Sequence, residues 1–283
     1  QQLGVTPGLK EMVEIYALDN SVYGQQHLKC NLQIENDIPR SNQYHYLFNS
    51  FLGRKHIYKL LTSWLNIDKN YSYSQGLDGI AAVISEISGF DFESSVVLFD
   101  KFLNKFLPSI KDPTENLLYV RSHIGRIELI LSFFEPALAL HIQRIGFASN
   151  MFAISWILTF YSNIFTIDRV IKIWEKMLVI PDFHYYFAAA MLCDLKSKIM
   201  LMDFNECAAC IKNLEGLVDI DHCIQYAVVM AKSLPKSFLV LNYRKEGDDE
   251  QFQNEFYTTR PWEIPPRLTD LTTQKNFSIS IFE

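Results

Sequence analysis

The 283-residue sequence has few of the features that mark extracellular, fibrous or membrane-spanning chains. It contains five cysteines, an odd number that suits a reducing compartment better than a disulfide framework. With 11 glycines and 10 prolines against 49% hydrophobic residues, the composition is globular rather than disordered or fibrous. The longest apolar stretch, residues 151–161, is well short of the roughly 18 residues that a spanning helix needs. We therefore expect a cytosolic protein without a transmembrane segment, long enough for one large core or two packed halves.

Positive charge is scarce as well, because the formal net charge is −6. Binding to a phosphate backbone requires clustered lysine and arginine, so this balance argues against nucleic acid as the main ligand. Residues 40–69 depart from it, with five basic side chains and a single acidic one, Asp68. Such a stretch is either a solvated helix face or a surface for an acidic partner. The five basic residues are Arg40, Arg54, Lys55, Lys59 and Lys69.

The dominant sequence pattern is helical. Apolar residues recur at intervals of three and four along two long segments, and each predicts one buried helix face. No alternating strand pattern accompanies them, so we predict an all-α fold of about ten to twelve helices. The two apolar sets are Val96, Phe99, Phe102, Leu103, Phe106 and Leu107, and Val170, Ile173, Trp174, Met177 and Leu178. Helix boundaries are expected at Asp112-Pro113, Thr166-Ile167-Asp168, Pro181-Asp182, Asp203 and Asp219.

Few groups suggest chemistry on their own. Cys207 and Cys210 have zinc-ligand spacing, with His222 and Cys223 downstream, but the sequence has no second Cys-x-x-Cys. Residues 203–206, Asp-Phe-Asn-Glu, favour a helix start, which places Cys207 and Cys210 on one helix face as core residues. Because the sequence also lacks a phosphate-binding loop and a nucleophile elbow, we expect no metal, no cofactor and no independent active site. Three tryptophans lie in apolar helical patterns and are predicted to be core residues: Trp64, Trp156 and Trp174.

A first candidate segment is residues 34–40, Ile-Glu-Asn-Asp-Ile-Pro-Arg. Arginine suits a phosphate site because its planar guanidinium stays charged and can donate two hydrogen bonds at once. Arg40 follows Asp37 by three residues with Pro39 between them, a spacing at which Asp37 can orient the guanidinium on a rigid turn. Taken alone, the same spacing is typical of a surface ion pair.

A second segment, Tyr-Ser-Gln-Gly-Leu-Asp at residues 73–78, supplies a glutamine. The Gln75 amide can accept a hydrogen bond from water and donate one to a phosphate oxygen, which suits a water-positioning role. The Tyr73 ring would form one side of such a site, and Gly76 would let another backbone approach closely. Alone, this segment is typical of a polar helix start. Together, an arginine and a glutamine are the side chains that assist GTP hydrolysis, because they neutralise phosphoryl charge and orient the attacking water.

Both segments resemble the TBC domain, the Tre-2/Bub2/Cdc16 module that activates Rab GTPases. The family's I-x-x-D-x-x-R corresponds to Ile34, Asp37 and Arg40, and its Y-x-Q corresponds to Tyr73 and Gln75. Residues 60–64 (Leu-Leu-Thr-Ser-Trp), 156–160 (Trp-Ile-Leu-Thr-Phe) and 173–175 (Ile-Trp-Glu) resemble further family segments. Within the family, the chain resembles the TBC domain-containing kinase-like proteins in residues 33–40, 75–78, 146–147, 152–156, 204–207 and 235–237.

The resemblance implies a TBC-type multi-helix domain of two packed helical subdomains. Residues 1–29 would lead into a TBC domain at residues 30–240, with halves at about 30–145 and 146–240, followed by a polar tail or linker at 241–283. The tail contains Trp262 and Phe277, which are expected to dock on the helical body. Kinase-like relatives carry a kinase-like region before the TBC domain and a rhodanese-like region after it. A chain that starts at Gln1, without a methionine or a signal-like run, fits a fragment of such a protein.

The family's mechanism implies a GTP-bound Rab-family GTPase as partner. Arg40 and Gln75 would be the catalytic fingers, Asp37 and Tyr73 would support them together with Ile34 and Gly76, and GTP and magnesium would belong to the partner. The expected setting is vesicle trafficking in the cytoplasm, with peripheral attachment to endomembranes through the Rab protein.

Two departures from the family pattern keep other interpretations open. Many members have an R-x-x-x-W element before the first motif, but Arg40 and Trp64 are the first arginine and tryptophan of this chain. The family's later W-D is Trp174-Glu175, a change that could alter a buried ion pair or cap. A non-catalytic module that binds a Rab protein or a larger assembly is therefore the alternative. A helical scaffold with coincidental motifs would place Arg40 and Gln75 far apart or bury them.

Overall fold

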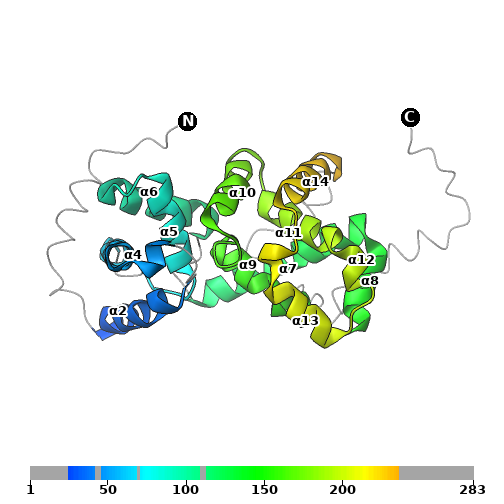
Figure 1. The fold of residues 1–283 in the computed structure, drawn as a ribbon, viewed down its shortest axis with the longest axis horizontal. Coiled ribbons are helices and arrows are strands. Elements are labelled where there is room, and N and C mark those ends of the chain that lie inside the picture. The colour runs from blue at the N-terminus through cyan, green and yellow to red at the C-terminus, as the bar shows by residue number, and fades with distance from the viewer. Residues whose placement is uncertain (1–24, 42–45, 69–70, 109–112, 236–283) are drawn as a thin grey trace, which may run out of the picture. The chain divides into compact units, whose positions relative to one another are not determined.

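The computed structural model describes residues 25–41, 46–68, 71–108 and 113–235. Within these residues the fold is helical without strands, as predicted (Figure 1). It has thirteen α-helices instead of ten to twelve. Two of them, α3 and α12, have four residues each and are too short to leave an apolar period in the sequence. The α-helices are α2 (Gln25–Asp37), α3 (Tyr46–Asn49), α4 (Phe51–Leu65), α5 (Leu77–Ile87), α6 (Phe92–Phe106), α7 (Pro113–Phe134), α8 (Pro136–Arg144), α9 (Ala153–Thr159), α10 (Ile167–Val179), α11 (Phe183–Asp194), α12 (Lys196–Ile199), α13 (Phe204–Lys212) and α14 (Ile220–Ser233). Short 3₁₀ helices among the described residues include η1 (Ile38–Arg40), η3 (Ser149–Met151) and η4 (Leu214–Gly216).

Helix α4 is the centre of the N-terminal group, α2 to α6, and packs against the other four helices of that group. The Ser50 hydroxyl caps α4 by accepting a hydrogen bond from the Gly53 amide at 2.9 Å. A Cβ atom at Gly53 would overlap the carbonyl oxygen of Leu47, so the tight turn between α3 and α4 needs glycine. The inward face of α4 is almost fully buried and consists of Ile57, Leu60, Leu61 and Trp64.

A buried carboxylate ties α4 to α6. Asp100 accepts hydrogen bonds from the Trp64 indole at 3.2 Å and from the Tyr71 hydroxyl at 2.7 Å, both at Oδ1. Its second oxygen accepts one from the Asn104 amide at 2.9 Å. A buried charge is costly unless it is hydrogen-bonded, and three donors meet that requirement here. The network fixes Tyr71, which begins the segment that carries Tyr73 and Gln75.

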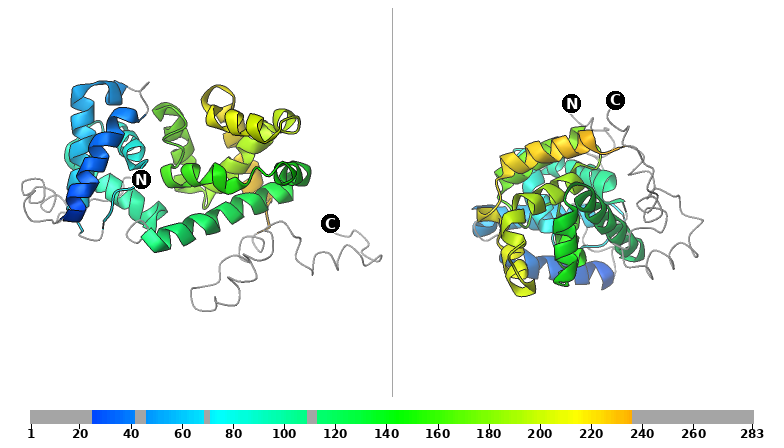
Figure 2. Two further views of the ribbon diagram at one scale, coloured as in Figure 1. Left: turned by 90° about the horizontal axis from the view of Figure 1, so that it is seen from below. Right: turned by 90° about the vertical axis from the view of Figure 1, so that its right-hand side faces the viewer.

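Helix α11 is the centre of the C-terminal group, α7 to α14. Every residue from Phe183 to Leu192 is buried, because α11 contacts α7, α9, α10, α12 and α14. The long helix α7 runs along other helices of this group (Figure 2) and packs on α8, α9 and α11. A helix buried on all sides shows no amphipathic stripe in its sequence.

Aromatic side chains join the two groups. The Phe102 ring of α6 stacks on Trp174 of α10 with 4.2 Å between ring centroids, and it meets the Phe160 ring edge-on at 5.3 Å. Helix α5 also contacts both α9 and α10. The two groups therefore share a core rather than folding around separate ones.

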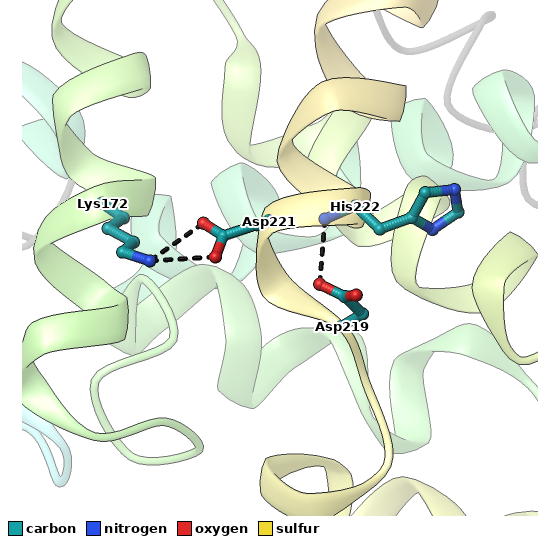
Figure 3. A network of polar contacts seen from close by, with 4 residues as sticks. All are labelled: Lys172, Asp219, Asp221 and His222. Carbon is teal, nitrogen blue, oxygen red and sulfur yellow. Dashed lines mark hydrogen bonds and ion pairs between the residues drawn. The ribbon is translucent and has the colours of Figure 1, made fainter.

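Polar contacts orient the start of α14 against α10 (Figure 3). Asp219 caps the helix by accepting the His222 amide at 3.0 Å, as the predicted boundary requires. Lys172 donates to both carboxylate oxygens of Asp221, at 2.9 and 3.0 Å. Because both side chains are more than half exposed, this pair contributes under about 1 kcal/mol and mainly selects the orientation of the helix.

Most residue-level predictions of the fold are confirmed. Asp203 begins α13 with a reciprocal capping box to Glu206, and Cys207 and Cys210 are buried on that helix. The three tryptophans predicted to be core residues are between 1% and 3% exposed. Leu178 is wrongly predicted, because it is 52% exposed at the edge of the α10 face, in the last turn of the helix.

Some sequence predictions lie outside the described residues. These are the positions of Lys69, Asp112 and the tail with Trp262 and Phe277. Contacts divide the chain into a unit from Gln1 to Leu234, which holds all the helices given above, and a unit from Pro235 to Glu283. The domain boundaries near residues 29, 145 and 240 stay predictions.

Two histidines are buried at the contact of α7 with α11. The rings of His123 and His184 lie 6.1 Å apart, and His123 stacks on Tyr185 at 5.1 Å. Burial, the neighbouring histidine and the Arg126 guanidinium lower the pKa of His123 to about 2. Burial and Arg126 lower the pKa of His184 to about 3. Both imidazoles are therefore neutral in the folded protein at any pH near neutrality.

We expect stability to fall as the pH drops below about 6.5. From there down to the folded-state pKa values, the unfolded chain binds protons at these histidines and the folded chain does not, so acid favours unfolding. Each histidine adds about 1.4 kcal/mol of lost stability per pH unit in this range. The free energy of unfolding, measured with urea at pH 7, 6, 5 and 4, should fall less steeply with decreasing pH in His184→Leu than in the wild type. Equal slopes in the two proteins would contradict the assignment.

Candidate functional site

The first candidate segment forms the end of α2 and the η1 turn that follows. Ile34 and Ile38 are buried at 0% and 3% exposure and anchor the segment in the core. Pro39 lacks an amide hydrogen and cannot continue the α2 hydrogen-bond pattern, so the chain tightens into the 3₁₀ turn. Arg40 is the last residue of this turn, and its side chain is exposed.

The second candidate segment leads into α5. Tyr73 is 5% exposed, whereas Gln75 is exposed. Gln75 and Gly76 are the central residues of a turn that closes with a hydrogen bond from the Leu77 amide to the Ser74 carbonyl at 3.3 Å. Gly76 has φ +103° and ψ −14°, close to the third residue of a type II turn, where a positive φ strongly favours glycine.

One hydroxyl connects the two segments. The Tyr73 hydroxyl lies 3.2 Å from Oδ2 of Asp37 at the end of α2 and 3.2 Å from Oδ1 of Asp78 in the first turn of α5. A phenol has a single proton, which the two carboxylates share. Burial and the charges of Asp78 and Asp37 raise the pKa of Tyr73 far above its usual range, so the hydroxyl remains a donor.

Ser41 and the backbone complete this network. The Ser41 hydroxyl donates to Oδ2 of Asp78 and also lies 3.0 Å from the Asp37 carbonyl oxygen. The Gly76 amide donates to Oδ1 of Asp78 at 3.1 Å. Asp78 is only 2% exposed, so these donors compensate the removal of its carboxylate from water. We call Asp37, Ser41, Tyr73 and Asp78 the motif clamp.

The motif clamp brings the two predicted fingers to one region of the protein. Arg40 directly precedes Ser41, and Gln75 stands between Tyr73 and Gly76, so each exposed side chain is next to a clamped backbone. The scaffold interpretation, which expects the two residues buried or far apart, receives no support from this arrangement. Helices α2 and α5, which adjoin the two segments, both pack against α4 (Figure 1).

The structure changes two of the predicted local roles. Asp37 contacts Tyr73, and within the described residues no ion pair joins it to Arg40, so it fixes the turn instead of orienting the guanidinium directly. The space beside Gly76 is occupied by a side chain, because a Cβ atom there would lie 2.5 Å from the Thr159 methyl carbon.

Sequence reasoning missed Ser41 and Asp78. Asp78 follows Gln75 by three residues and lies in the first turn of a mostly apolar helix, in which Leu77 to Ser85 are all buried. A carboxylate at the start of so apolar a segment signals a buried, hydrogen-bonded acid. Ser41 carries no such signal, because nothing in the sequence places it against a residue 37 positions away.

The cysteines, the basic stretch and Glu175, which the sequence also singled out, lie outside the motif clamp. The described residues contain no group of three or more His, Cys, Asp or Glu side chains that could hold a metal ion. Burial raises the pKa of Cys207 and Cys210, which keeps both thiols protonated. Of the basic stretch, Lys55 and Lys59 are exposed on α4, and the Lys59 ammonium lies 4.1 Å from the Phe92 ring centroid. Glu175, at the changed W-D position, is exposed and so belongs to no buried ion pair.

The fold and the site define a class of protein, namely all-α domains that present an arginine and a glutamine from two hydrogen-bonded motifs. The chain belongs to the Rab-GTPase-TBC domain family, whose sequence profile matches residues 8–200. No helix in the described part of this chain is long and apolar enough to cross a membrane.

Curated relatives bear a common name. The chain is 28% identical over 248 residues to a TBC domain-containing protein kinase-like protein of Dictyostelium discoideum, and 27% identical over 231 residues to one of Gallus gallus. The human protein of that name is 26% identical over 226 residues. These alignments cover 83%, 81% and 79% of this chain, but only 23%, 25% and 25% of the relatives. The chain thus spans about a quarter of the length of these relatives.

Two solved structures share the fold. The crystal structure of the Ypt/Rab-GAP domain of Gyp1p aligns with a TM-score of 0.67 at 19% identity, covering 79% of this chain and 81% of that one. The Chlamydomonas flagellar RabGAP TBC domain aligns with a TM-score of 0.63 at 18% identity, covering 82% and 73%. At these identities the likeness establishes the fold alone.

Removal of the Tyr73 hydroxyl tests the motif clamp. Tyr73→Phe leaves the buried Asp78 and the half-buried Asp37 without this donor, so we expect a loss of about 1 to 3 kcal/mol in the free energy of unfolding, measured with urea. Tyr226→Phe on α14, remote from the clamp in sequence and half-buried, is the control and should change stability by less than about 0.5 kcal/mol. Equal losses in the two variants would show that the clamp is energetically unimportant.

Proposed function

We propose that the chain is a GTPase-activating domain for a Rab-family GTPase, to which it supplies Arg40 and Gln75 in trans. The observation that carries this proposal is the motif clamp, which ties an exposed arginine and an exposed glutamine to one hydrogen-bonded network. Membership of the Rab-GTPase-TBC domain family supports it, as does the fold shared with domains described as Rab-GAPs.

Arg40 acts on the charge of the phosphoryl group. As GTP is hydrolysed, negative charge develops on the oxygens around the transferring phosphorus and on the leaving phosphate. A guanidinium inserted beside these oxygens can donate two parallel hydrogen bonds, which an ammonium cannot. Its place at the end of the proline-tightened η1 turn limits the backbone freedom lost on insertion.

Gln75 acts on the attacking water. Its amide oxygen accepts a hydrogen bond from the water and its amide nitrogen donates to a phosphate oxygen, which fixes the direction of attack. Its position at the tip of the turn between Ser74 and Leu77 lets the side chain reach into a partner protein. Asp37, Tyr73, Ile34 and Gly76 then serve as positioning residues, since they hold the backbone that carries the two fingers.

The domain needs no cofactor of its own in this mechanism, because GTP and magnesium belong to the partner. The names of the curated relatives suggest a longer protein with a kinase-like region, and a rhodanese-like region is a further proposal from the family resemblance. We place the domain in the cytoplasm, peripheral to endomembranes through its Rab partner and active in vesicle trafficking.

Single-turnover GTP hydrolysis across a panel of GTP-loaded Rab proteins tests the proposal. We expect the wild type to accelerate one or a few of them. Arg40→Ala should lose roughly a thousandfold of that acceleration or more, and Arg40→Lys should restore little of it. Gln75→Ala should lose roughly a hundredfold, because the water is then unoriented.

The matched control is Arg144→Ala, which removes an exposed arginine from the end of α8, a helix that packs on α7 and α12. It should hydrolyse like the wild type. Full stimulation by Arg40→Ala would overturn the two-finger mechanism. Saturable binding of GTP-loaded Rab without stimulation by the wild type would identify the alternative, a non-catalytic Rab-binding module.

A further inference from the structure

The turn after α9 holds two aromatic residues in an unfavourable backbone conformation. Phe160 has φ 45° and Tyr161 has φ 71°, both in the left-handed region that favours glycine and asparagine. Strain of this kind persists only where the surroundings enforce it. Residues 159–162 are all at most 3% exposed.

Hydrogen bonds from side chains to backbone carbonyl oxygens hold this turn in place. The Trp174 indole donates to the Phe160 carbonyl oxygen at 2.9 Å, and the Tyr161 hydroxyl donates to the His184 carbonyl oxygen. Within the turn, the Ser162 hydroxyl donates to the Thr159 carbonyl oxygen at 2.7 Å. The turn is thus fixed from α10 and α11, the core of the C-terminal group.

The start of α5 rests directly on this turn. A Cβ atom at Gly76 would lie 2.5 Å from the Thr159 methyl carbon, and a Cβ atom at Gly79 would lie 2.7 Å from the Ser162 hydroxyl oxygen. Both distances are far below van der Waals contact, so a Cβ atom at either position would force the neighbouring side chain or α5 to shift. Gly79 lies in the first turn of α5, three residues after its N-cap Gly76, and both glycines approach the same Thr159–Ser162 turn.

We propose that the Thr159–Ser162 turn is the seat that positions Gln75. This inference rests on the proposed function, because it assigns Thr159 and Ser162 as positioning residues for the proposed glutamine finger. Gln75 immediately precedes Gly76, so a shift of the α5 start away from the seat moves the turn that carries the amide. Arg40 lies outside α5, and the motif clamp links its turn to that helix, which predicts a weaker dependence for Arg40 than for Gln75.

Gly79→Ala tests the seat with a single methyl group. In an ordinary helix interior this change stabilises the protein, since alanine is the better helix former. Here the methyl carbon meets the Ser162 oxygen, which is buried and cannot rotate without losing its bond to Thr159. Ser162→Ala removes that oxygen and leaves the next atom at 3.3 Å, so Gly79→Ala/Ser162→Ala should restore the approach. Gly125→Ala on α7, where a Cβ atom meets nothing within 4 Å, is the matched control.

The first readout is independent of activity. The ¹⁵N resonance of the Gly76 amide, in glycine-labelled protein, should move in Gly79→Ala, return toward the wild-type position in the double variant and stay unchanged in Gly125→Ala. Thermal unfolding of each variant identifies any that fails to fold. An unmoved Gly76 resonance in folded Gly79→Ala would overturn the seat, whether or not the domain stimulates a GTPase.

The second readout is the single-turnover rate at saturating domain. Gly79→Ala should lower this rate by about ten- to a hundredfold with little change in the half-saturating concentration. The double variant Gly79→Ala/Ser162→Ala should recover most of the lost rate. In a Gln75→Ala background, Gly79→Ala should cost nothing further, because the side chain it positions is gone. An equal loss in both backgrounds would overturn the assignment to Gln75. A wild type that stimulates no Rab protein would instead overturn the proposed function and leave the seat to be decided by the Gly76 resonance.

Discussion

The Tyr73 hydroxyl lies between two carboxylates that belong to different helices, and the candidate site depends on this contact. Asp37 ends α2 and Asp78 lies in the first turn of α5, so one phenol links two helix ends that come together only in the folded chain. Hydrogen bonds to a buried carboxylate are stronger than neutral ones and are expensive to lose, which makes the junction rigid. Ser41 and the Gly76 amide add donors to the same carboxylate, and the backbone is therefore held on both sides of Arg40 and beside Gln75.

Helix α5 carries this junction into the rest of the molecule. Its first nine residues are buried, and they pack on α4 and α6 from the N-terminal group and on α9 and α10 from the C-terminal group. Both candidate fingers belong to the N-terminal group, yet the helix beside Gln75 rests on a strained turn that α10 and α11 hold in place. The strain at Phe160 and Tyr161 is thus compensated by contacts of the C-terminal core, at the point where that core touches the site.

This arrangement bears on the departures from the family pattern. The chain has no arginine or tryptophan before its first motif, but the motif turn is anchored by the buried Ile34 and Ile38 and by the clamp. The replacement of W-D by Trp174-Glu175 leaves the tryptophan in its structural role, since its indole holds Phe160 while Glu175 faces solvent. Neither departure touches the side chains that we propose for catalysis. The match to about a quarter of each curated relative leaves the activity of any longer protein a proposal.

The sequence by itself determined the fold class and the identity of the two motifs, because helical periodicity, caps and motif spacing are local properties of the chain. It correctly placed the tryptophans and the α13 cysteines in the core, but it missed α3 and α12, which are too short to show a period. Only the tertiary structure decided which group each polar side chain of the site contacts. Ser41 and Asp78 are 37 residues apart, as Gly79 and Ser162 are far apart in the chain, and no local pattern encodes such contacts. These contacts exist because packing brings distant segments together. A buried charge is stable only with hydrogen-bond donors, and a strained turn only where its surroundings hold it, so burial determines which residues contact one another.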